Sequence, residues 1–475
     1  MGGCFTMKQE HTVLSSGGLH TIGALTVVLT LLFSASEVYA VPSFARQTGM
    51  SCTSCHTAFP QLTPFGRAFK LYGYTMSSHQ SDLPPLAMML QGAPGFTHTE
   101  KAQPAADVPS GFSNNDNFSL NQMSFFYAGR LFGPYADRLV GKSLASILNH
   151  IGVFAQGTWD GVANQWSWDN MEIRAAKGLT VADTNVVLGV YANNNPTLQD
   201  LWNTSPAWSF PFSGSNLAPA PVAAPLLAGG LAQQVVGFGG YGMFNNLLYL
   251  EVGAYKTLSG HAQKSLGVDP TGEAQIDDLA PYWRVALEKN WSVHSLEIGT
   301  VGLSAPTFPG RDRSAGHDFL TDVGVDLQYQ YFSALHDVTL LTNWMHETQR
   351  LRASRQLGSA SNLSNNLWTA SLAASYLFDK TYGVTLQYSR IGGDKDLTLY
   401  GPRTGRPDTD RWIFQLDYLP FNKSGGPRLW PMSNVKLSLQ YTLYPQFNGS
   451  HRNFDGSGRN ASDNNTLYLS AWIAF

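Results

Sequence analysis

The chain has 475 residues, with 30 Lys and Arg against 33 Asp and Glu, so its formal net charge is −3. Charged residues make up 13% of the chain, about half of the ~25% that is usual for soluble globular domains. Aromatic residues make up 12%, which excludes a disordered chain, because such chains are rich in charge and poor in aromatics. The near-neutral balance gives no indication of nucleic-acid binding. The composition therefore indicates a large, β-prone protein with few charged groups.

An export signal is predicted at the N-terminus. The apolar run Ile22–Phe33 follows Lys8, and small residues lead from it to Ala40. This order is typical of a secretory signal peptide that is cleaved after Ala40. An uncleaved anchor helix is the alternative, but the run is shorter than the ~20 residues that a membrane-spanning helix needs.

Residues 52–56 read Cys-Thr-Ser-Cys-His. Two thiols at this spacing can each form a thioether with one haem vinyl group, and the histidine that follows is then the proximal iron ligand. Cys52 and Cys55 are also the two cysteines that remain once residues 1–40 are removed. We therefore predict one covalent haem c, attached to Cys52 and Cys55, with His56 as an axial ligand.

The same five residues admit other interpretations. A redox-active disulfide is one, although the surrounding sequence lacks the βαβ pattern of a thioredoxin-like fold. Half of a zinc site is another, and it would need further ligands from scattered histidines. A chance match is the third.

The sequence does not identify the sixth iron ligand. Met76 and His79 are candidates, and Met50 also lies close to the motif. A Met or His ligand would give a low-spin electron carrier, whereas an open position would allow ligand binding. The alternative for Met76 is ordinary packing, and for His79 it is a solvated loop position.

Alternation of apolar and polar residues recurs from residue 83 onward, and Gly, Asn, Asp and Pro clusters bound each segment. Residues 322–331 are a clear example. One face of this segment carries Val323, Val325, Leu327, Tyr329 and Tyr331, and the other carries Asp322, Gly324, Asp326, Gln328 and Gln330. Such alternation predicts β-strands with one apolar and one polar face.

Sixteen segments of this kind are predicted, an even number as expected for a bacterial outer-membrane barrel. The length of most segments, about ten residues or more, suits a strand that is tilted across a membrane. The segments are 86–99, 119–131, 146–159, 166–176, 184–194, 233–244, 247–258, 281–289, 293–303, 318–332, 336–350, 364–378, 382–391, 409–419, 434–444 and 465–475.

The links between segments mostly alternate between long and short from the fifth segment onward. Residues 195–232 form a long link, for example, and the next link is the tight turn 245–246. This asymmetry is typical of outer-membrane barrels, which have short periplasmic turns and longer extracellular loops. The links 132–145, 160–165 and 420–433 depart from it.

A soluble β-sandwich would show similar alternation, because it also buries one face of each strand. It would carry more surface charge than this chain, however. The chain also ends at Phe475, a terminal aromatic of the kind that outer-membrane barrels carry. We therefore predict an all-β transmembrane barrel of about sixteen antiparallel strands in the bacterial outer membrane.

Two other features have simple interpretations. Residues 237–242 fit the pattern G-x-G-x-x-G, but they lie inside an alternating segment, so we interpret the glycines as space in a barrel wall. The link 203–230 is rich in Asn, Ser, Gly and Pro and is predicted to be a mobile surface loop.

Four acidic residues of the strands are expected to face the lumen. They either set the electrostatic field there or are simply hydrated. These residues are Asp322, Asp326, Glu251 and Glu297.

The residues around the Cys-Thr-Ser-Cys-His motif resemble one protein family. The features that carry the resemblance are Pro42-Ser-Phe44-Ala-Arg46-Gln-Thr-Gly49, Cys52–His56, Pro60, Leu62, Phe65-Gly66-Arg67, Phe69-Lys70 and Gly73-Tyr74. This stretch of about forty residues resembles the fused monohaem cytochrome–porins, the outer-membrane iron(II) oxidases of iron(II)-oxidising bacteria. The remainder of the chain is similar to that family in its length, its barrel pattern and its terminal Phe475.

The resemblance implies three parts: a signal peptide (1–40), a monohaem c-type cytochrome domain (41–82) and a porin-like barrel (83–475). A domain of about forty residues is too small to fold robustly alone, so we expect residues 41–82 to plug or cap the barrel lumen.

Basic residues of the cytochrome segment are expected to pair with the haem propionates, because Arg and Lys favour such oxyanions. Solvation or contact with the barrel wall is the alternative. The basic residues concerned are Arg46, Arg67 and Lys70. The aromatic residues that would wall the haem, or else form the core of the segment, are Phe44, Phe65 and Phe69.

The resemblance also implies extracellular electron transfer. Iron(II) or a similar donor would be oxidised at the cell surface, and the electron would pass to a periplasmic c-type cytochrome. The sequence does not identify the iron(II) site. The alternatives are a haem-bearing outer-membrane porin with a transport or sensing role and a soluble periplasmic electron carrier with a β-domain.

Overall fold

The computed structural model describes residues 43–77, 83–268, 275–401, 403–423 and 433–475. The expected signal peptide and His79 lie outside these residues. Within the described ranges, no helix combines the length and the apolar character needed to cross a membrane.

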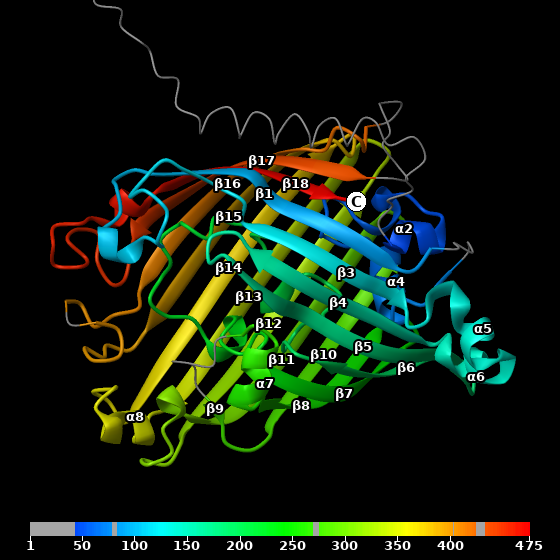
Figure 1. Cartoon of the computed structure of the whole chain (residues 1–475), viewed down its shortest axis with the longest axis horizontal. Coiled ribbons are helices and arrows are strands. Elements are labelled where there is room, and N and C mark those ends of the chain that lie inside the picture. The colour runs from blue at the N-terminus through cyan, green and yellow to red at the C-terminus, as the bar shows by residue number, and fades with distance from the viewer. Residues whose placement is uncertain (1–42, 78–82, 269–274, 402, 424–432) are drawn as a thin grey trace, which may run out of the picture. The chain divides into compact units, whose positions relative to one another are not determined.

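In the described part of the chain, sixteen long antiparallel strands close into a barrel (Figure 1). Each strand pairs with its neighbours along the chain, and β1 pairs with both β3 and β18, which closes the ring. The strands are β1 (Leu86–Thr99), β3 (Gln122–Arg130), β4 (Ile151–Asp160), β5 (Gln165–Val181), β6 (Thr184–Asn193), β7 (Val235–Phe244), β8 (Leu248–Thr257), β10 (Ala280–Trp291), β11 (His294–Phe308), β12 (Asp318–Phe332), β13 (His336–Arg350), β14 (Ser364–Phe378), β15 (Tyr382–Gly393), β16 (Thr409–Tyr418), β17 (Asn434–Gln446) and β18 (Thr466–Ala474). Two short strands, β2 (Asn117–Ser119) and β9 (Gln275–Ile276), pair with β1 and β11.

The sixteen predicted segments are confirmed as these sixteen strands. The segments 86–99, 318–332, 336–350 and 364–378 agree with β1, β12, β13 and β14 at both ends. The prediction ended β5 too early, at residue 176. Residues 177–181 are exposed on both faces of the strand, so the alternation that marks a half-buried strand is lost there.

The barrel is apolar outside and polar inside, as the alternation of β12 illustrates. Val323 and Val325 are 40% and 50% exposed on the outer face, whereas Asp326 and Gln328 are buried in the lumen. Other exposed apolar side chains of the strands include Val252, Ile298, Leu372, Val384 and Leu416. A soluble β-sandwich buries its apolar faces, so this inverted arrangement contradicts that alternative and is typical of a barrel that spans a bilayer.

Short links gather at one end of the barrel, which we call the turn end; the opposite end is the loop end. The links 182–183, 245–247, 292–293, 333–335 and 379–381 define the turn end. Asn245 and Asn246 have φ of 53° and 52°, which a two-residue hairpin turn of this handedness requires. Exposed aromatic side chains beside these turns form a girdle of the kind found at bilayer interfaces: Trp291, Phe378, Tyr382 and Tyr418.

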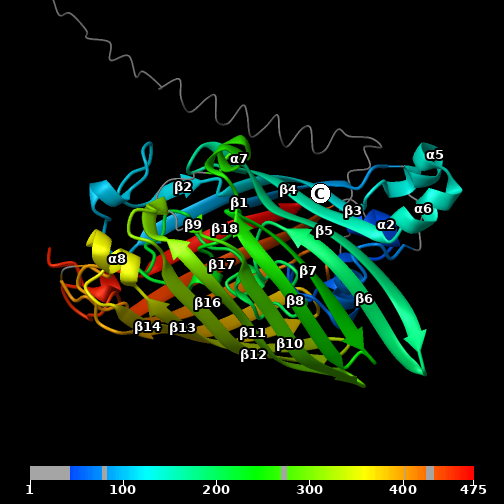
Figure 2. The ribbon, with the colours of Figure 1, turned by 90° about the horizontal axis from the view of Figure 1, so that it is seen from below.

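Three links break the alternation, as their lengths in the sequence indicated, and one of them is the long link 419–433 between β16 and β17 at the turn end. The link 131–150 lies at the turn end and forms the helices η2 (Gly133–Tyr135), α5 (Ala136–Val140) and α6 (Lys142–Leu148), while the short link 161–164 lies at the loop end. Figure 2 shows α8 at the end of the barrel opposite α5 and α6. Loop-end helices are η1 (Ala105–Asp107), α7 (Gly260–Ser265), η5 (Pro309–Arg311), α8 (Arg352–Leu357) and η6 (Ala461–Asn464).

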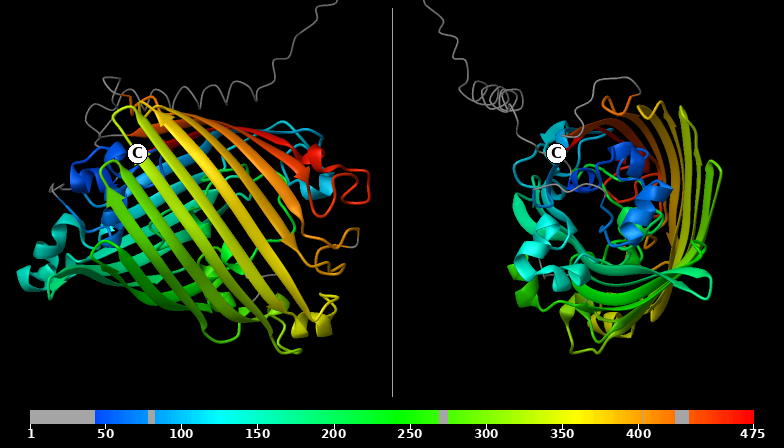
Figure 3. Two further views of the ribbon diagram at one scale, coloured as in Figure 1. Left: turned by 180° about the vertical axis from the view of Figure 1, so that it is seen from behind. Right: turned by 90° about the vertical axis from the view of Figure 1, so that its right-hand side faces the viewer.

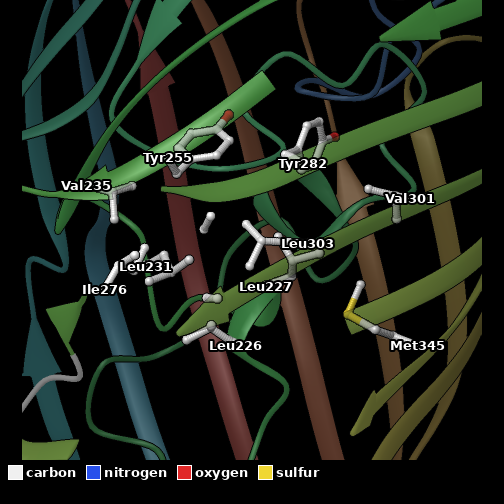
Figure 4. Close-up of a cluster of buried hydrophobic side chains, with 12 residues drawn as sticks. Leu226, Leu227, Leu231, Val235, Tyr255, Ile276, Tyr282, Val301, Leu303 and Met345 are labelled. Carbon is white, nitrogen blue, oxygen red and sulfur yellow. The ribbon is translucent and has the colours of Figure 1, made fainter. Parts of the chain in front are cut away.

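The link 194–234, which we call the inner loop, folds into the lumen, so the prediction of a mobile surface loop at 203–230 is wrong. Trp202 is 0% exposed and Leu198 is 1% exposed. The physical reason is the composition of the loop. Asp200 is the one charged residue between positions 195 and 232, so the loop has few charged groups that favour contact with water. Figure 4 shows the side chains of its second short helix packed against the barrel wall: Leu226, Leu227 and Leu231 lie with Tyr255, Tyr282, Leu303 and Met345. The inner loop contains η3 (Pro206–Trp208) and η4 (Leu226–Ala228).

Acidic residues of the barrel wall hold the inner loop in place. Asp322 accepts a hydrogen bond from the backbone N–H of Leu227 at 2.7 Å, and Glu251 accepts one from the side chain of Gln199 at 2.6 Å. The lumen position expected for Asp322, Asp326, Glu251 and Glu297 is confirmed, but these carboxylates are buried rather than hydrated.

One buried arginine makes ion pairs with three carboxylates in this region. The guanidinium of Arg284 lies 2.7 Å from Asp326, 3.2 Å from Asp200 of the inner loop and 3.3 Å from Glu297. Its side chain is 0% exposed, and it lies over the ring of Trp202. Buried charges of this kind have to be paired, so Arg284 fixes the inner loop to β10, β11 and β12.

The glycines of β7 leave space for tyrosine side chains, which confirms the interpretation made from the sequence. A Cβ atom at Gly237 would lie 2.1 Å from the ring of Tyr255, and one at Gly239 would lie 2.5 Å from the hydroxyl of Tyr191. Neither position tolerates a larger residue without movement of the wall.

Substitution of Arg284 is expected to destabilise the filled barrel. Arg284→Met leaves Glu297 and Asp326 buried without their cation and leaves Asp200 with Lys70 alone, which costs about 3–5 kcal/mol of unfolding free energy. Urea unfolding in detergent micelles measures the change. The matched control is Arg406→Met, an exposed arginine 3.8 Å from Asp408, with an expected loss below ~1 kcal/mol. Equal stability of the two variants would contradict a charge-held inner loop.

Candidate functional site

Residues 43–77, which we call the plug segment, lie inside the lumen at the turn end (Figure 3). The segment contains α2 (Ser43–Thr48), α3 (Cys52–Cys55) and α4 (Pro64–Leu71). The ring of Phe59 meets that of Trp472 edge to face at 5.4 Å, and Lys436 donates a hydrogen bond to the Phe59 carbonyl at 2.8 Å. The segment therefore occupies the lumen, while its assignment as a cytochrome domain stays a prediction.

The Cys-Thr-Ser-Cys-His motif forms one helical turn that is fixed to the next helix. Thr63 caps α4, since its hydroxyl accepts from the N–H of Gly66 at 3.2 Å, and its own N–H donates to the Cys55 carbonyl at 2.9 Å. A Cβ atom at Gly66 would lie 2.2 Å from that carbonyl oxygen. The two helices are therefore in direct backbone contact, and Cys52 and Cys55, three residues apart, lie on one side of α3.

His56 follows α3 and is held in one orientation. Its Nδ1 lies 3.2 Å from the carbonyl oxygen of Pro60. A carbonyl can only accept, so Nδ1 is the donor and Nε2 is the nitrogen that can bind a metal. Burial lowers the pKa of His56 to about 4, so the ring is neutral at pH 7, which is the form that binds iron.

The two cysteines are free and half-buried. Burial raises the pKa of both thiols, and the neighbouring Cys52 adds to the effect at Cys55, whose pKa rises to about 11. Redox-active Cys-X-X-Cys pairs have lowered pKa values, so these thiols do not fit that alternative. The described residues also contain no group of three or more His, Cys, Asp or Glu side chains that could hold a metal ion, as a zinc site would require.

A cavity adjoins the motif on its C-terminal side. It is small and is lined by Thr57 and Gln61 of the plug segment, Phe210 and Phe212 of the inner loop, and Lys436 of β17; Cys52, Cys55 and His56 do not line it. Gln61 is 3% exposed, and its Nε2 is a buried donor without a hydrogen-bond partner among the described residues. Paired thiols and a neutral, oriented histidine are the side chains that covalent attachment of a haem would use, so the haem stays a prediction that rests on these three residues.

Arg67 belongs to the barrel wall in this structure. Its guanidinium makes an ion pair with Glu288 at 3.1 Å and donates to Gln330 and Ser295, both at 2.6 Å. The side chain is 2% exposed. Contact with the wall was the alternative to pairing with a propionate, and the structure places Arg67 in that contact.

Lys70 likewise contacts the inner loop. Its Nζ donates to the backbone carbonyls of Leu198 and Asp200, at 2.8 and 2.6 Å, and lies over the ring of Trp208. Burial lowers the pKa of Lys70 to about 7, although nearby carboxylates partly oppose the shift. The amine therefore ties α4 to the inner loop.

Arg46 connects the plug segment to the first strand. Its guanidinium donates to the carbonyl of Pro84 at 3.0 Å and to that of Leu86. Burial lowers the pKa of Arg46. The pairing of Arg46 with a haem propionate stays a prediction.

Aromatic residues form the core of the plug segment. Phe44 meets Phe69 edge to face at 4.9 Å and stacks on Tyr74 at 5.5 Å, and Tyr74 reaches Phe154 of β4 at 6.1 Å. Phe44 and Phe69 thus take the core position that was the alternative to walling a haem. Phe65 is half-buried on α4, and its contact with a haem stays a prediction.

The structure leaves the sixth ligand open. Met76 is half-buried, and its backbone carbonyl accepts from the Gln47 side chain at 2.9 Å. Met50 is 36% exposed. His79 lies outside the described residues.

Sequence reasoning missed two residues that hold the plug segment. Lys436 contacts both Phe59 and Trp472, and the hydroxyl of Tyr74 donates to Glu172 at 2.9 Å. Both partners, Lys436 and Glu172, lie on inward faces of their strands. A charged residue on the polar face of an alternating segment could therefore have indicated a contact with the plug segment.

No family model and no curated protein matches this chain. Solved structures similar to it are outer-membrane proteins. They include in-vitro folded OmpT of Vibrio cholerae (8% identity, TM-score 0.39, 82% of this chain and 96% of that one) and the outer-membrane channel DcaP of Acinetobacter baumannii (10%, 0.43, 82% and 96%). A third is OmpF of Salmonella typhi in complex with daunomycin (12%, 0.41, 82% and 97%). The assignment of an outer-membrane-type barrel rests on the strand pairing and the apolar outer face of the chain itself.

Substitution of Gly66 is expected to separate α3 from α4. In Gly66→Ala the added methyl overlaps the Cys55 carbonyl, which destabilises the plug segment by about 1–3 kcal/mol. The expected result is less covalent haem per protein, measured by the pyridine haemochrome spectrum. Gly214→Ala is the control, because nothing lies within 4 Å of a Cβ at that position. Normal haem content in Gly66→Ala would contradict the close contact.

The buried amine of Lys70 predicts a pH dependence of stability. Its pKa of about 7 in the folded chain lies below the ordinary 10.5, so between these values the unfolded chain binds one more proton. The unfolding free energy therefore rises with pH across this window, and below it Lys70 contributes no pH dependence. Lys70→Met is expected to flatten the rise in denaturant titrations, whereas Lys101→Met, at a side chain 57% exposed, should not. The same slope in Lys70→Met and the parent protein would show that the amine does not titrate there.

Proposed function

We propose that this protein transfers electrons across the bacterial outer membrane. Iron(II), or a similar extracellular donor, is the reductant, and a periplasmic c-type cytochrome is the acceptor. The observation that carries the proposal is a Cys-Thr-Ser-Cys-His motif held inside the lumen of a barrel with a lipid-facing surface. The proposal includes export by a signal peptide that is cleaved after Ala40.

Three residues would hold the cofactor. Cys52 and Cys55 would carry a haem c through thioethers, and the Nε2 of His56 would bind its iron. A haem c bound there supplies one-electron oxidation and reduction. Each iron(II) loses one electron and becomes iron(III), and that electron reduces one acceptor protein by one electron.

The rest of the chain orients this motif, whose residues are half-buried. Thr63 and Gly66 fix α3 against α4, and the Pro60 carbonyl sets the tautomer of His56. Arg67 and Lys70 fasten α4 to the wall and to the inner loop. Together these contacts hold the motif in one place while the surrounding lumen stays filled.

A second candidate is a haem-bearing porin with a transport or sensing role. The closed sixteen-strand barrel in the described residues favours it, and the fold supports this candidate more directly than it supports electron transfer. The plug segment and the inner loop occupy the lumen, however, so a solute could pass only if one of them moved.

The test is anaerobic addition of iron(II) to the purified, oxidised full-length protein in detergent. We expect the reduced haem c absorbance bands to appear, and His56→Ala and Cys55→Ala to lose this reduction while the barrel still resists unfolding in dodecyl sulfate. His98→Ala, at an exposed histidine of the loop end, is the control and should behave as the parent protein.

Each outcome discriminates between the candidates. A colourless protein, or oxidised bands unchanged by iron(II), would overturn the electron-transfer proposal. Swelling of protein-containing liposomes in small sugars, without iron(II)-dependent reduction, would favour the porin. Recovery in a periplasmic rather than an outer-membrane fraction would contradict both.

A further inference from the structure

The helices α5 and α6 form a surface at the turn end that is separate from the ring of barrel strands. Residues 136–148 lie beyond the ends of β4, β5 and β6 (Figures 1 and 3). We call this stretch, together with the end of the neighbouring β5–β6 hairpin at 177–183, the rim surface. Short turns face the periplasm in outer-membrane barrels, so the rim surface faces the periplasm.

The hairpin extends past β4 on one side, while on the other side β6 stays paired with β7 as far as Val186. The pairing of β5 with β4 ends at Ala175, whereas its pairing with β6 continues to Val181. The N–H of Ala176 donates to the His150 carbonyl at 3.1 Å, which joins the hairpin to the chain that leaves α6. Helices and hairpin therefore form one continuous surface.

Large apolar side chains are exposed on the helices. Leu139 is 65% exposed, Leu144 48% and Ile147 63%. Leu144 and Ile147 are three residues apart on α6 and so share a face. On the strands, exposed apolar residues are explained by lipid, but α5 and α6 project past the strand ends. A cluster of exposed apolar residues in that position marks an interaction surface.

The rim surface carries a small excess of positive charge, three exposed basic residues against two acidic ones. Arg138, Lys142 and Lys177 are exposed, against the exposed acids Asp137 and Asp183. A protein interface typically combines an apolar centre with a charged rim, and the sign of the rim selects the partner. The complementary partner carries an acidic face.

The plug segment contacts the rim surface at the hairpin and also contacts Arg130, which lies just before the link that forms α5 and α6. Arg130, where β3 leads into the helices, donates through Nε to the Thr75 carbonyl at 3.0 Å. A Cβ atom at Gly178, in the hairpin, would lie 2.9 Å from the hydroxyl of Tyr72. A protein bound at the rim surface would thus lie beside the segment that carries the Cys-Thr-Ser-Cys-His motif.

We propose that the rim surface docks the soluble electron acceptor, a small periplasmic redox protein whose exposed cofactor edge is apolar and ringed by acidic side chains. This inference rests on the proposed electron transfer. Basic and apolar residues on short helices also occur where proteins touch anionic lipid. The projection of α5 and α6 past the strands, and the contact of the neighbouring Arg130 and Gly178 with the plug segment, favour a protein partner instead.

The test measures electron exchange rather than iron oxidation. Full-length haem protein in detergent is reduced with dithionite, freed of excess reductant and mixed in a stopped-flow instrument with an acidic or a basic soluble c-type cytochrome. For the parent protein we expect faster reduction of the acidic probe, with a rate that falls as salt is added.

Two double variants test the two parts of the surface. Arg138→Glu with Lys142→Glu is expected to slow reduction of the acidic probe by about tenfold and to speed that of the basic probe. Leu144→Ser with Ile147→Ser is expected to slow both several-fold. The control, Lys395→Glu with Arg403→Glu, reverses two exposed charges at the loop end and should change neither rate.

The outcomes separate this inference from the proposed function. Unchanged rates in both rim variants, with normal haem content, would overturn the docking site and leave the electron-transfer proposal intact. Failure of iron(II) to reduce the parent protein, with normal salt-dependent exchange, would overturn iron oxidation and leave the docking site. Variants that lose affinity for phosphatidylglycerol vesicles but keep their exchange rates would assign the rim surface to lipid and overturn the docking site.

Discussion

Pairing of buried charge inside the lumen is the constraint on which this structure depends. A sixteen-strand barrel with a polar interior must either hold water or bring partners to its inward side chains. Here the partners come from two segments, the inner loop and the plug segment, which meet Arg284, Glu288 and their neighbours on the wall. The two segments also bind each other, through Lys70 with Asp200 and through the Leu62 N–H with Asn203. Removal of either segment would therefore leave charges of the wall and of the other segment unpaired.

The strands were predictable because a lipid-facing barrel enforces alternation along every strand, and the motif was predictable because five adjacent residues carry it. The inner loop was not. Its Asn, Ser, Gly and Pro content is that of a surface loop, and its partners, such as Asp322 for Leu227, lie about a hundred residues away in sequence. Arg67 shows the same limit. Its guanidinium can pair with a haem propionate as well as with a glutamate side chain, and its partner Glu288 lies 221 residues further along the chain. Local sequence thus identifies the chemistry of a side chain, whereas the fold decides which partner it meets.

A filled lumen separates the two candidate functions physically. Diffusion of a solute needs a continuous aqueous path, whereas the plug segment and the inner loop place buried side chains such as Arg67 and Trp202 in the lumen. Electron transfer needs close, fixed redox groups and gains from the exclusion of water, since polar groups in a dry site keep their orientation. The same contacts that obstruct a pore would therefore serve an electron-transfer protein.

The plug segment and the barrel also depend on each other. The helices of the segment are short, and its aromatic core of Phe44, Phe69 and Tyr74 is small for independent folding. Its buried polar groups, Arg67, Lys70 and the Tyr74 hydroxyl, find their partners in the wall and the inner loop. Burial of these groups without such partners would cost several kcal/mol, so the isolated segment would expose them and lose its packing. The orientation of His56 and the two cysteines is thus a property of the whole barrel, which explains physically why one chain carries both parts.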